Sequence, residues 1–115
     1  MVETVPVSPP LKVTLEFAGG AELLFEKQKS IAAELPPLKK YLPECEKQNW
    51  TMRELLQWIE AYYLRERPEL FLQGESVRPG LLVLINESDW ELYDELEYEI
   101  KDNDTITFIS TLHGG

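Results

Sequence analysis

The chain has 115 residues and a mass of 13.3 kDa, with 43% hydrophobic and 28% charged residues, so we expect one folded domain. Its formal net charge of -10 argues against direct nucleic-acid binding and against docking on an anionic membrane. The one cysteine excludes an internal disulfide, and we expect a soluble protein of a reducing compartment, the cytoplasm and also the nucleus.

Two predicted strands follow an N-terminal leader. Residues 1–10 contain three prolines and are expected to be flexible. From Leu11 to Phe17 apolar and polar residues alternate, which is typical of a half-buried strand. The turn signal at Gly19-Gly20 and the apolar stretch 21–26 then predict a β-hairpin.

Residues 27–49 carry five lysines and three prolines without a sustained period. We interpret them as a long loop with a short helical piece near residues 31–35, although a loop of this length is unusual in a compact domain. Cys45 lies in this segment between two glutamates, which oppose formation of its thiolate. We interpret it as an incidental thiol, with a redox or acceptor role as the alternative.

The main helix is predicted to begin at Thr51. Thr51 and Glu54 have the spacing of a capping box, in which each side chain accepts a hydrogen bond from the other residue's amide. Apolar residues then recur on one face as far as Tyr63, and Pro68 requires the helix to end before it.

The second half of the chain is predicted to complete a sheet. Residues 81–85 are continuously apolar, as in a central strand buried on both sides, and residues 86–89 form a polar turn. We expect next a brief strand at 90–92, then one or two helical turns within 93–100 and a last strand at 105–112. The expected fold is α+β, a mixed sheet of four to five strands packed on one main helix, with the domain spanning 11–110.

No strong catalytic or metal-binding signal is present. The one histidine, His113, has no nucleophile in a recognisable arrangement, and Gly19-Gly20 is not a phosphate-binding loop. One histidine and one cysteine make a metal site improbable. The many carboxylates are dense and unpatterned, as on a solvated face. The chain is therefore not expected to be an enzyme.

The acidic residues are concentrated near the C-terminus. Residues 87–115 hold nine acids and one base, a net charge of -8, and residues 1–86 hold twelve acids and ten bases, a net charge of -2. This distribution serves solubility or steers the domain to a basic partner.

The chain ends in a polar tail, residues 111–115, that stops at Gly114-Gly115. Extended at roughly 3.3 Å per residue, these five residues reach about 16 Å beyond the sheet. Glycine has no Cβ, so the backbone can enter a channel that a side chain would block. The Gly115 carbonyl is then open to attack by a nucleophile, which makes Gly115 the candidate reactive residue.

The order of elements and the Gly-Gly end resemble the ubiquitin-like β-grasp fold, which includes the sulfur carriers of molybdopterin and thiamine synthesis. Six sequence blocks look more closely like the eukaryotic ubiquitin-related modifier family: Glu16–Phe25, Glu66–Phe71, Gly74–Gly80, Leu82–Asn86, Asp89–Leu92 and Phe108–Gly115. The leader and the 27–49 loop are longer than in the family's shorter members, and no role follows for them. A lysine of that loop either accepts a modifier or only adds solubility.

The resemblance implies that the chain is the substrate of a ubiquitin-type activating enzyme with a rhodanese domain. That enzyme would use its own ATP to adenylate the Gly115 carboxylate and would then convert it to a thiocarboxylate. A tRNA thiolase complex would take the sulfur for 2-thiouridine at the wobble position. Conjugation to lysines of proteins such as peroxiredoxins under oxidative stress is also implied.

The same resemblance implies roles for the tail residues next to Gly114 and Gly115. Thr111, Leu112 and His113 would contact the activating enzyme's channel, while the chain would bind no cofactor stably and would act as a monomer. Two alternatives stay open: a β-grasp interaction module that never uses its C-terminus, and a sulfur donor dedicated to molybdopterin or thiamine synthesis.

Overall fold

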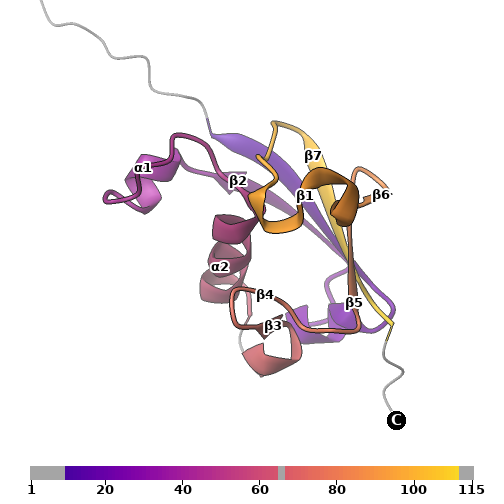
Figure 1. The fold of residues 1–115 in the computed structure, drawn as a ribbon. Coiled ribbons are helices and arrows are strands. Elements are labelled where there is room, and N and C mark those ends of the chain that lie inside the picture. Colours follow the sequence, from indigo (N-terminus) through magenta and orange to yellow (C-terminus); the bar gives the residue numbers. More distant parts are fainter. Residues whose placement is uncertain (1–9, 65–66, 112–115) are drawn as a thin grey trace, which may run out of the picture.

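A computed structural model describes residues 10–64 and 67–111, in which a five-stranded mixed sheet packs on one long helix (Figure 1). The strands lie in the order β2-β1-β7-β5-β6. Their bounds are Leu11–Ala18 for β1, Ser30–Leu35 for β2, Leu81–Ile85 for β5, Ser88–Asp89 for β6 and Asp104–Ser110 for β7. β1 is parallel to β7, and the other neighbours in the sheet are antiparallel. This is the predicted α+β architecture.

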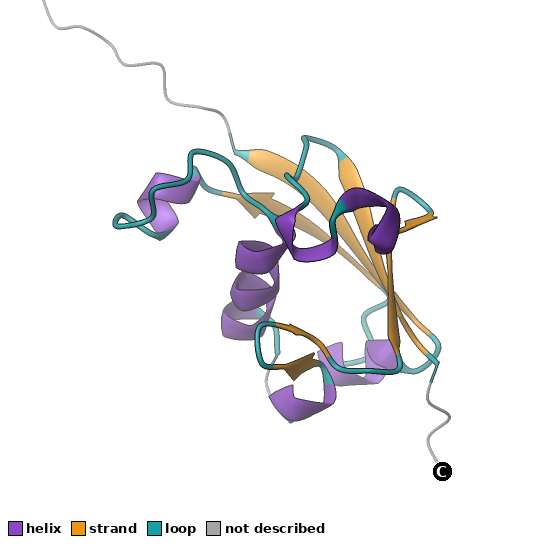
Figure 2. Cartoon of the chain, viewed as in Figure 1, coloured by secondary structure: helices purple, strands orange, loops and turns teal. Residues whose placement is uncertain are grey.

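One face of the sheet forms the core because apolar residues alternate along each strand. Val13, Leu15 and Phe17 of β1 are buried, and so are alternate residues of β2, β5 and β7. Helix α2, Met52–Tyr62, covers this face, as Figure 2 shows. The described residues contain no helix that is long and apolar enough to cross a membrane.

Helix α2 begins as predicted. The Thr51 amide donates a 2.8 Å hydrogen bond to Oε1 of Glu54, and the Thr51 side chain accepts from the backbone of Glu54. The helix buries Leu55, Leu56 and Ile59 against the sheet. It ends at Tyr62, one residue before the end of the predicted apolar face and before Pro68.

The predicted second strand is wrong in its position. Residues Ala21–Phe25 form a short 3-10 helix, η1, and the strand that pairs with β1 lies at Ser30–Leu35. The physical reason is that a helical turn brings Phe25 back over the core, where its ring lies 4.0 Å from that of Phe17. In a strand, successive side chains would instead point to opposite faces of the sheet.

The long loop predicted at 27–49 is therefore also wrong in large part. β2 occupies its beginning, with Ile31, Ala33 and Leu35 buried. Helix α1, Leu38–Tyr41, follows and buries Leu38. The short helical piece expected near 31–35 is absent there, because the pairing with β1 fixes those residues as a strand.

Smaller corrections concern the second half. A two-stranded hairpin of β3, Leu72–Gln73, and β4, Ser76–Val77, precedes β5 and was not predicted. The brief strand expected at 90–92 is the 3-10 helix η3, Trp90–Tyr93, and the expected helical turns include η4, Glu95–Glu97. β5 is buried on one face only, because Leu82 and Leu84 are half-buried on the open face of the sheet.

Candidate functional site

The candidate site is the place where the last strand, β7, leaves the sheet. β7 ends at Ser110, and Thr111 follows as the last described residue. Thr111 donates two hydrogen bonds to the carbonyl oxygen of Gly80, from its amide at 2.7 Å and from its hydroxyl at 2.6 Å. These two bonds continue the pairing of β7 with β5 by one residue and hold Thr111 beside Gly80.

The turn after β1 lies against the same exit, because β1 and β7 are parallel neighbours whose ends coincide (Figure 1). Gly19 has φ +66°, and a Cβ built on it would lie 2.4 Å from the carbonyl oxygen of Ser110. No Cβ can approach a backbone oxygen so closely, so only glycine fits here. The loop before β5 contributes Gly80, with φ +100°.

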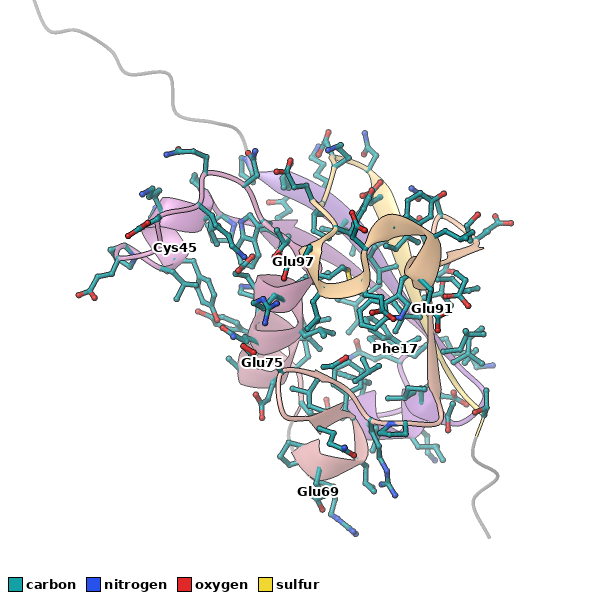
Figure 3. The ribbon with its side chains drawn as sticks, in the orientation of Figure 1. Phe17, Cys45, Glu69, Glu75, Glu91 and Glu97 are labelled. Carbon is teal, nitrogen blue, oxygen red and sulfur yellow. The ribbon has the colours of Figure 1, made fainter. Side chains whose placement is uncertain are left out.

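The four phenylalanines of the chain gather beneath this exit. Phe17 and Phe108, which lie two residues before Gly19 and Ser110, are stacked with their ring centroids 5.7 Å apart. Phe25 and Phe71 complete the cluster, with centroids 5.3 Å apart, and Phe71 lies 5.2 Å from Phe108. All four are buried, so the exit rests on a rigid support. Figure 3 shows Phe17 in the interior.

Electrostatic contacts join the start of α2 to neighbouring segments. Lys47 contacts the Oε2 of Glu54 at 2.8 Å. Burial alone would raise the pKa of Glu54, but hydrogen bonds from Lys47 and Thr51 outweigh it and lower the pKa. Arg53 forms ion pairs with Glu75 of the β3–β4 turn and with Glu97 of η4. Figure 3 shows both glutamates near the helix.

The acidic C-terminal quarter forms an exposed surface over η3 and η4. Glu91, Asp94, Glu95 and Glu97 are exposed, and of these only Glu97 forms an ion pair among the described residues. Its role in steering remains a prediction.

The structure brings together residues that the sequence did not connect. Of the predicted tail residues, Thr111 is described and contacts Gly80, while Leu112, His113, Gly114 and Gly115 lie outside the described residues. The roles of Gly19 and Gly80 were missed. The sequence signal for Gly19 was a glycine doublet that a hairpin turn explained equally well.

Other candidate chemistry is not assembled in the described part of the chain. Within residues 10–64 and 67–111, no three His, Cys, Asp or Glu side chains are grouped so that they could hold a metal ion. Cys45 is partly buried, and its Sγ accepts a hydrogen bond of 3.4 Å from the Lys47 amide.

Comparisons with known proteins agree on one family. The family model described as Urm1 (ubiquitin related modifier) matches residues 12–115. A ubiquitin-related modifier 1 homolog from Bombyx mori is 61% identical over 91% of this chain and 96% of its own length, and ubiquitin-related modifier 1 from Homo sapiens is 52% identical over 95% and 100%. The solution structure of Urm1 from Trypanosoma brucei superposes with a TM-score of 0.71, at 38% identity over 94% of this chain and 99% of that one.

Proposed function

The chain belongs to the Urm1, or ubiquitin-related modifier, family, and we propose that its function resides in a C-terminal thiocarboxylate formed on Gly115. Members of this family are ubiquitin-like modifiers with the β-grasp fold, which this chain shares. The observation that supports the proposal best is the double hydrogen bond from Thr111 to Gly80. It holds Thr111 in place three residues before Gly114, the first of the two glycines.

In the proposed reaction the chain is a substrate. A carboxylate oxygen of Gly115 attacks the α-phosphorus of ATP held by a ubiquitin-type activating enzyme, and pyrophosphate leaves. The terminal sulfur of a persulfide on the rhodanese domain of that enzyme then attacks the Gly115 carbonyl, and AMP leaves. A thiol of the enzyme cleaves the sulfur–sulfur bond of the resulting acyl disulfide, forming a disulfide and releasing the thiocarboxylate.

The residues before Gly115 have a steric role in this proposal. Thr111 fixes the starting direction, while Leu112 and His113 contact the walls of the enzyme's channel. Gly114 and Gly115 pass its narrowest part because neither has a Cβ. Placement matters because adenylation needs the attacking oxygen about 3–3.5 Å from phosphorus.

The thiocarboxylate has two proposed uses. A tRNA thiolase complex takes its sulfur for 2-thiolation of the wobble uridine, so the acidic chain never has to bind RNA itself. Alternatively, a lysine amine of a target protein attacks the Gly115 carbonyl and sulfide leaves, giving an isopeptide bond. Peroxiredoxins under oxidative stress are the proposed targets, and the cytoplasm is the proposed location.

Intact-mass spectrometry tests this proposal. The purified chain is incubated with the activating enzyme, ATP and a persulfide donor, and a gain of about 16 Da is expected because sulfur replaces oxygen. Omission of ATP must abolish the gain, and fragmentation must place it on Gly115. An unchanged mass in the complete reaction would refute the sulfur-carrier function and favour an interaction module. Sulfur delivered to a molybdopterin or thiamine precursor, and not to tRNA, would refute the assigned pathway.

A further inference from the structure

The outer side of β2 carries backbone groups that pair with no other residue in the described part of the chain. Among residues 10–64 and 67–111, β1 is the only strand that pairs with β2, so β2 is an edge strand. The Phe17 amide donates to the Lys29 carbonyl at 3.0 Å, and hydrogen-bonded pairs alternate along an antiparallel ladder. By this alternation, the backbone groups of Ser30, Ala32 and Glu34 point away from β1. These three residues are exposed.

An aromatic row runs alongside this edge on the core side of the sheet. At one end of β2, Tyr62 and Tyr63 line a hollow with Ile31. At the other end, Trp50 donates a hydrogen bond of 2.7 Å from its indole to the Pro36 carbonyl. Ring contacts connect the two ends: Trp58 with Tyr62 at 5.2 Å and with Trp50 at 6.4 Å, and Tyr41 with Trp50 at 5.2 Å.

This row is accessible where it meets the beginning of β2. Tyr62 is 55% exposed, although it is a large side chain on the helix that covers the core. The hollow beside it has a volume of about 200 Å³ and is lined by Phe25, Glu26, Gln28, Ile31, Tyr62 and Tyr63. The open backbone edge and this partly aromatic hollow therefore lie next to each other.

The charge around the edge differs in sign from the rest of the protein. Residues 27–40 contain four lysines and one glutamate, a net charge of +3 in a chain whose net charge is -10. The lysines form two pairs, Lys27 with Lys29 before β2 and Lys39 with Lys40 after it, and all four are exposed. None of the four forms an ion pair within the described residues.

We propose that the outer edge of β2 accepts an acidic, extended peptide segment of a partner protein as an additional strand of the sheet. Main-chain hydrogen bonds to Ser30, Ala32 and Glu34 supply the pairing, as in other cases of strand addition. Alternate apolar side chains of the peptide face the aromatic row. Acidic residues before and after its strand lie beside the two lysine pairs. This surface does not include the C-terminal tail, so the proposal is independent of the sulfur-carrier function.

Lysines at a sheet edge also protect against aggregation, and this alternative must be distinguished. Protective lysines usually lie on the edge strand itself, whereas these four lie outside Ser30–Leu35 and leave its backbone groups uncovered. The two explanations also predict different results: if the lysines only protect against aggregation, no acidic peptide should bind to the edge of β2.

Nuclear magnetic resonance with a defined peptide tests the proposal on the full chain. The probe is the peptide Asp-Asp-Val-Thr-Ile-Thr-Val-Asp-Asp, acetylated and amidated at its ends. At millimolar peptide, the amide hydrogens of Ser30, Ala32 and Glu34 are expected to exchange more slowly with solvent, and the signals of Tyr62 and Tyr63 to shift. The control is a peptide of the same composition whose apolar residues are adjacent to one another, so that they do not alternate along a strand.

Matched variants separate backbone pairing from charge. Ala32→Pro removes one outward amide without disturbing the ladder to β1, and about tenfold weaker binding is expected. Ala32→Val, which keeps that amide, should bind as the wild type does. Reversal of one lysine pair, Lys27→Glu with Lys29→Glu, should weaken binding about tenfold and reduce its salt dependence.

Three results would overturn the proposal. The first is an absence of binding at millimolar peptide, and the second is equal binding by Ala32→Pro and Ala32→Val. The third is slow exchange of these three amides in the free protein, because another part or copy of this chain would then already cover the edge. Thermal unfolding of each variant establishes that the fold is retained.

Discussion

The Tyr98 hydroxyl donates a hydrogen bond of 2.6 Å to Oδ2 of Asp104, at the first residue of β7. Asp104 is buried and also accepts hydrogen bonds from the Lys101 amide at 2.8 Å and from the Asn86 side chain at 2.9 Å. Burial and the Asp104 carboxylate raise the pKa of Tyr98, so its phenol keeps its proton. One carboxylate thus fixes the start of the strand that leads to the candidate site.

We expect Asp104→Ala to lower the free energy of unfolding by about 2–4 kcal/mol, because it leaves three donors without their acceptor. Chemical denaturation measures this loss. Asp102→Ala is the matched control, since Asp102 is exposed and, among the described residues, accepts only from the Lys12 and Asn103 nitrogens. Equal losses in the two variants would show that the buried cluster around Asp104 adds nothing beyond an exposed contact.

Glu54 should make stability depend on pH. Its pKa is lowered in the folded state, so its contribution to stability is present above the unfolded-state pKa, about 4.3 for glutamate, and is lost as the pH falls through the lower folded-state pKa. We expect Glu54→Gln to be less stable at neutral pH by about 1–2 kcal/mol and to lose less stability on acidification. Unfolding curves between neutral and acidic pH measure both effects, and parallel pH profiles would contradict this role.

The sequence predicted the elements whose signals are local and missed those that depend on distant contacts. The Thr51–Glu54 capping box and the alternation of Leu11–Phe17 identified α2 and β1 without knowledge of the fold. β2 was missed because Ala32 and Ala33 weaken its alternation, and because burial of its inward residues depends on pairing with β1. The stronger apolar run at 21–26 was preferred although its residues serve the phenylalanine cluster as a 3-10 helix.

The same limit applies to the candidate site. Gly114 and Gly115 were predicted as site residues from the Gly-Gly end and a family resemblance, and their role stays a prediction. The exit itself depends on Gly19, Gly80 and Thr111, which lie far apart in sequence and meet because β7 pairs with β1 on one side and with β5 on the other. No local pattern carries that information.

Deletion of the 27–49 segment is expected to unfold the domain, because this segment contains β2. A less drastic test is Leu35→Ala, which removes a side chain that is completely buried and should cost about 2–5 kcal/mol. Glu34→Ala, one residue earlier and exposed, should change stability by no more than about 0.5 kcal/mol. Thermal melts compare the two, and similar effects would mean that β2 does not belong to the core.

Gly19→Ala should disturb the exit of β7. The added Cβ would meet the Ser110 carbonyl oxygen at 2.4 Å, so the backbone must move, in addition to a cost of about 1–2 kcal/mol for a positive φ. Gly74→Ala is the matched control, because Gly74 has φ +65° and its Cβ would meet nothing within 4 Å. We expect amide shifts at Ser110 and Thr111, and slower thiocarboxylate formation, only in Gly19→Ala. Equal effects of the two variants would indicate backbone strain alone.

Removal of Gly115 tests the proposed reaction most directly. The shortened chain still ends in a glycine carboxylate, but the reacting carbon is moved back by one residue, roughly 3.5 Å. Since adenylation depends on placement within about 3–3.5 Å of phosphorus, we expect no thiocarboxylate even though the protein melts at the wild-type temperature. Gly114→Leu should fail for a different reason, because its side chain obstructs the channel. Intact mass after reaction with the activating enzyme and wobble-uridine thiolation in cells are the two measurements. Normal thiolation with the Gly115-deleted chain would show that the function does not depend on this carboxylate.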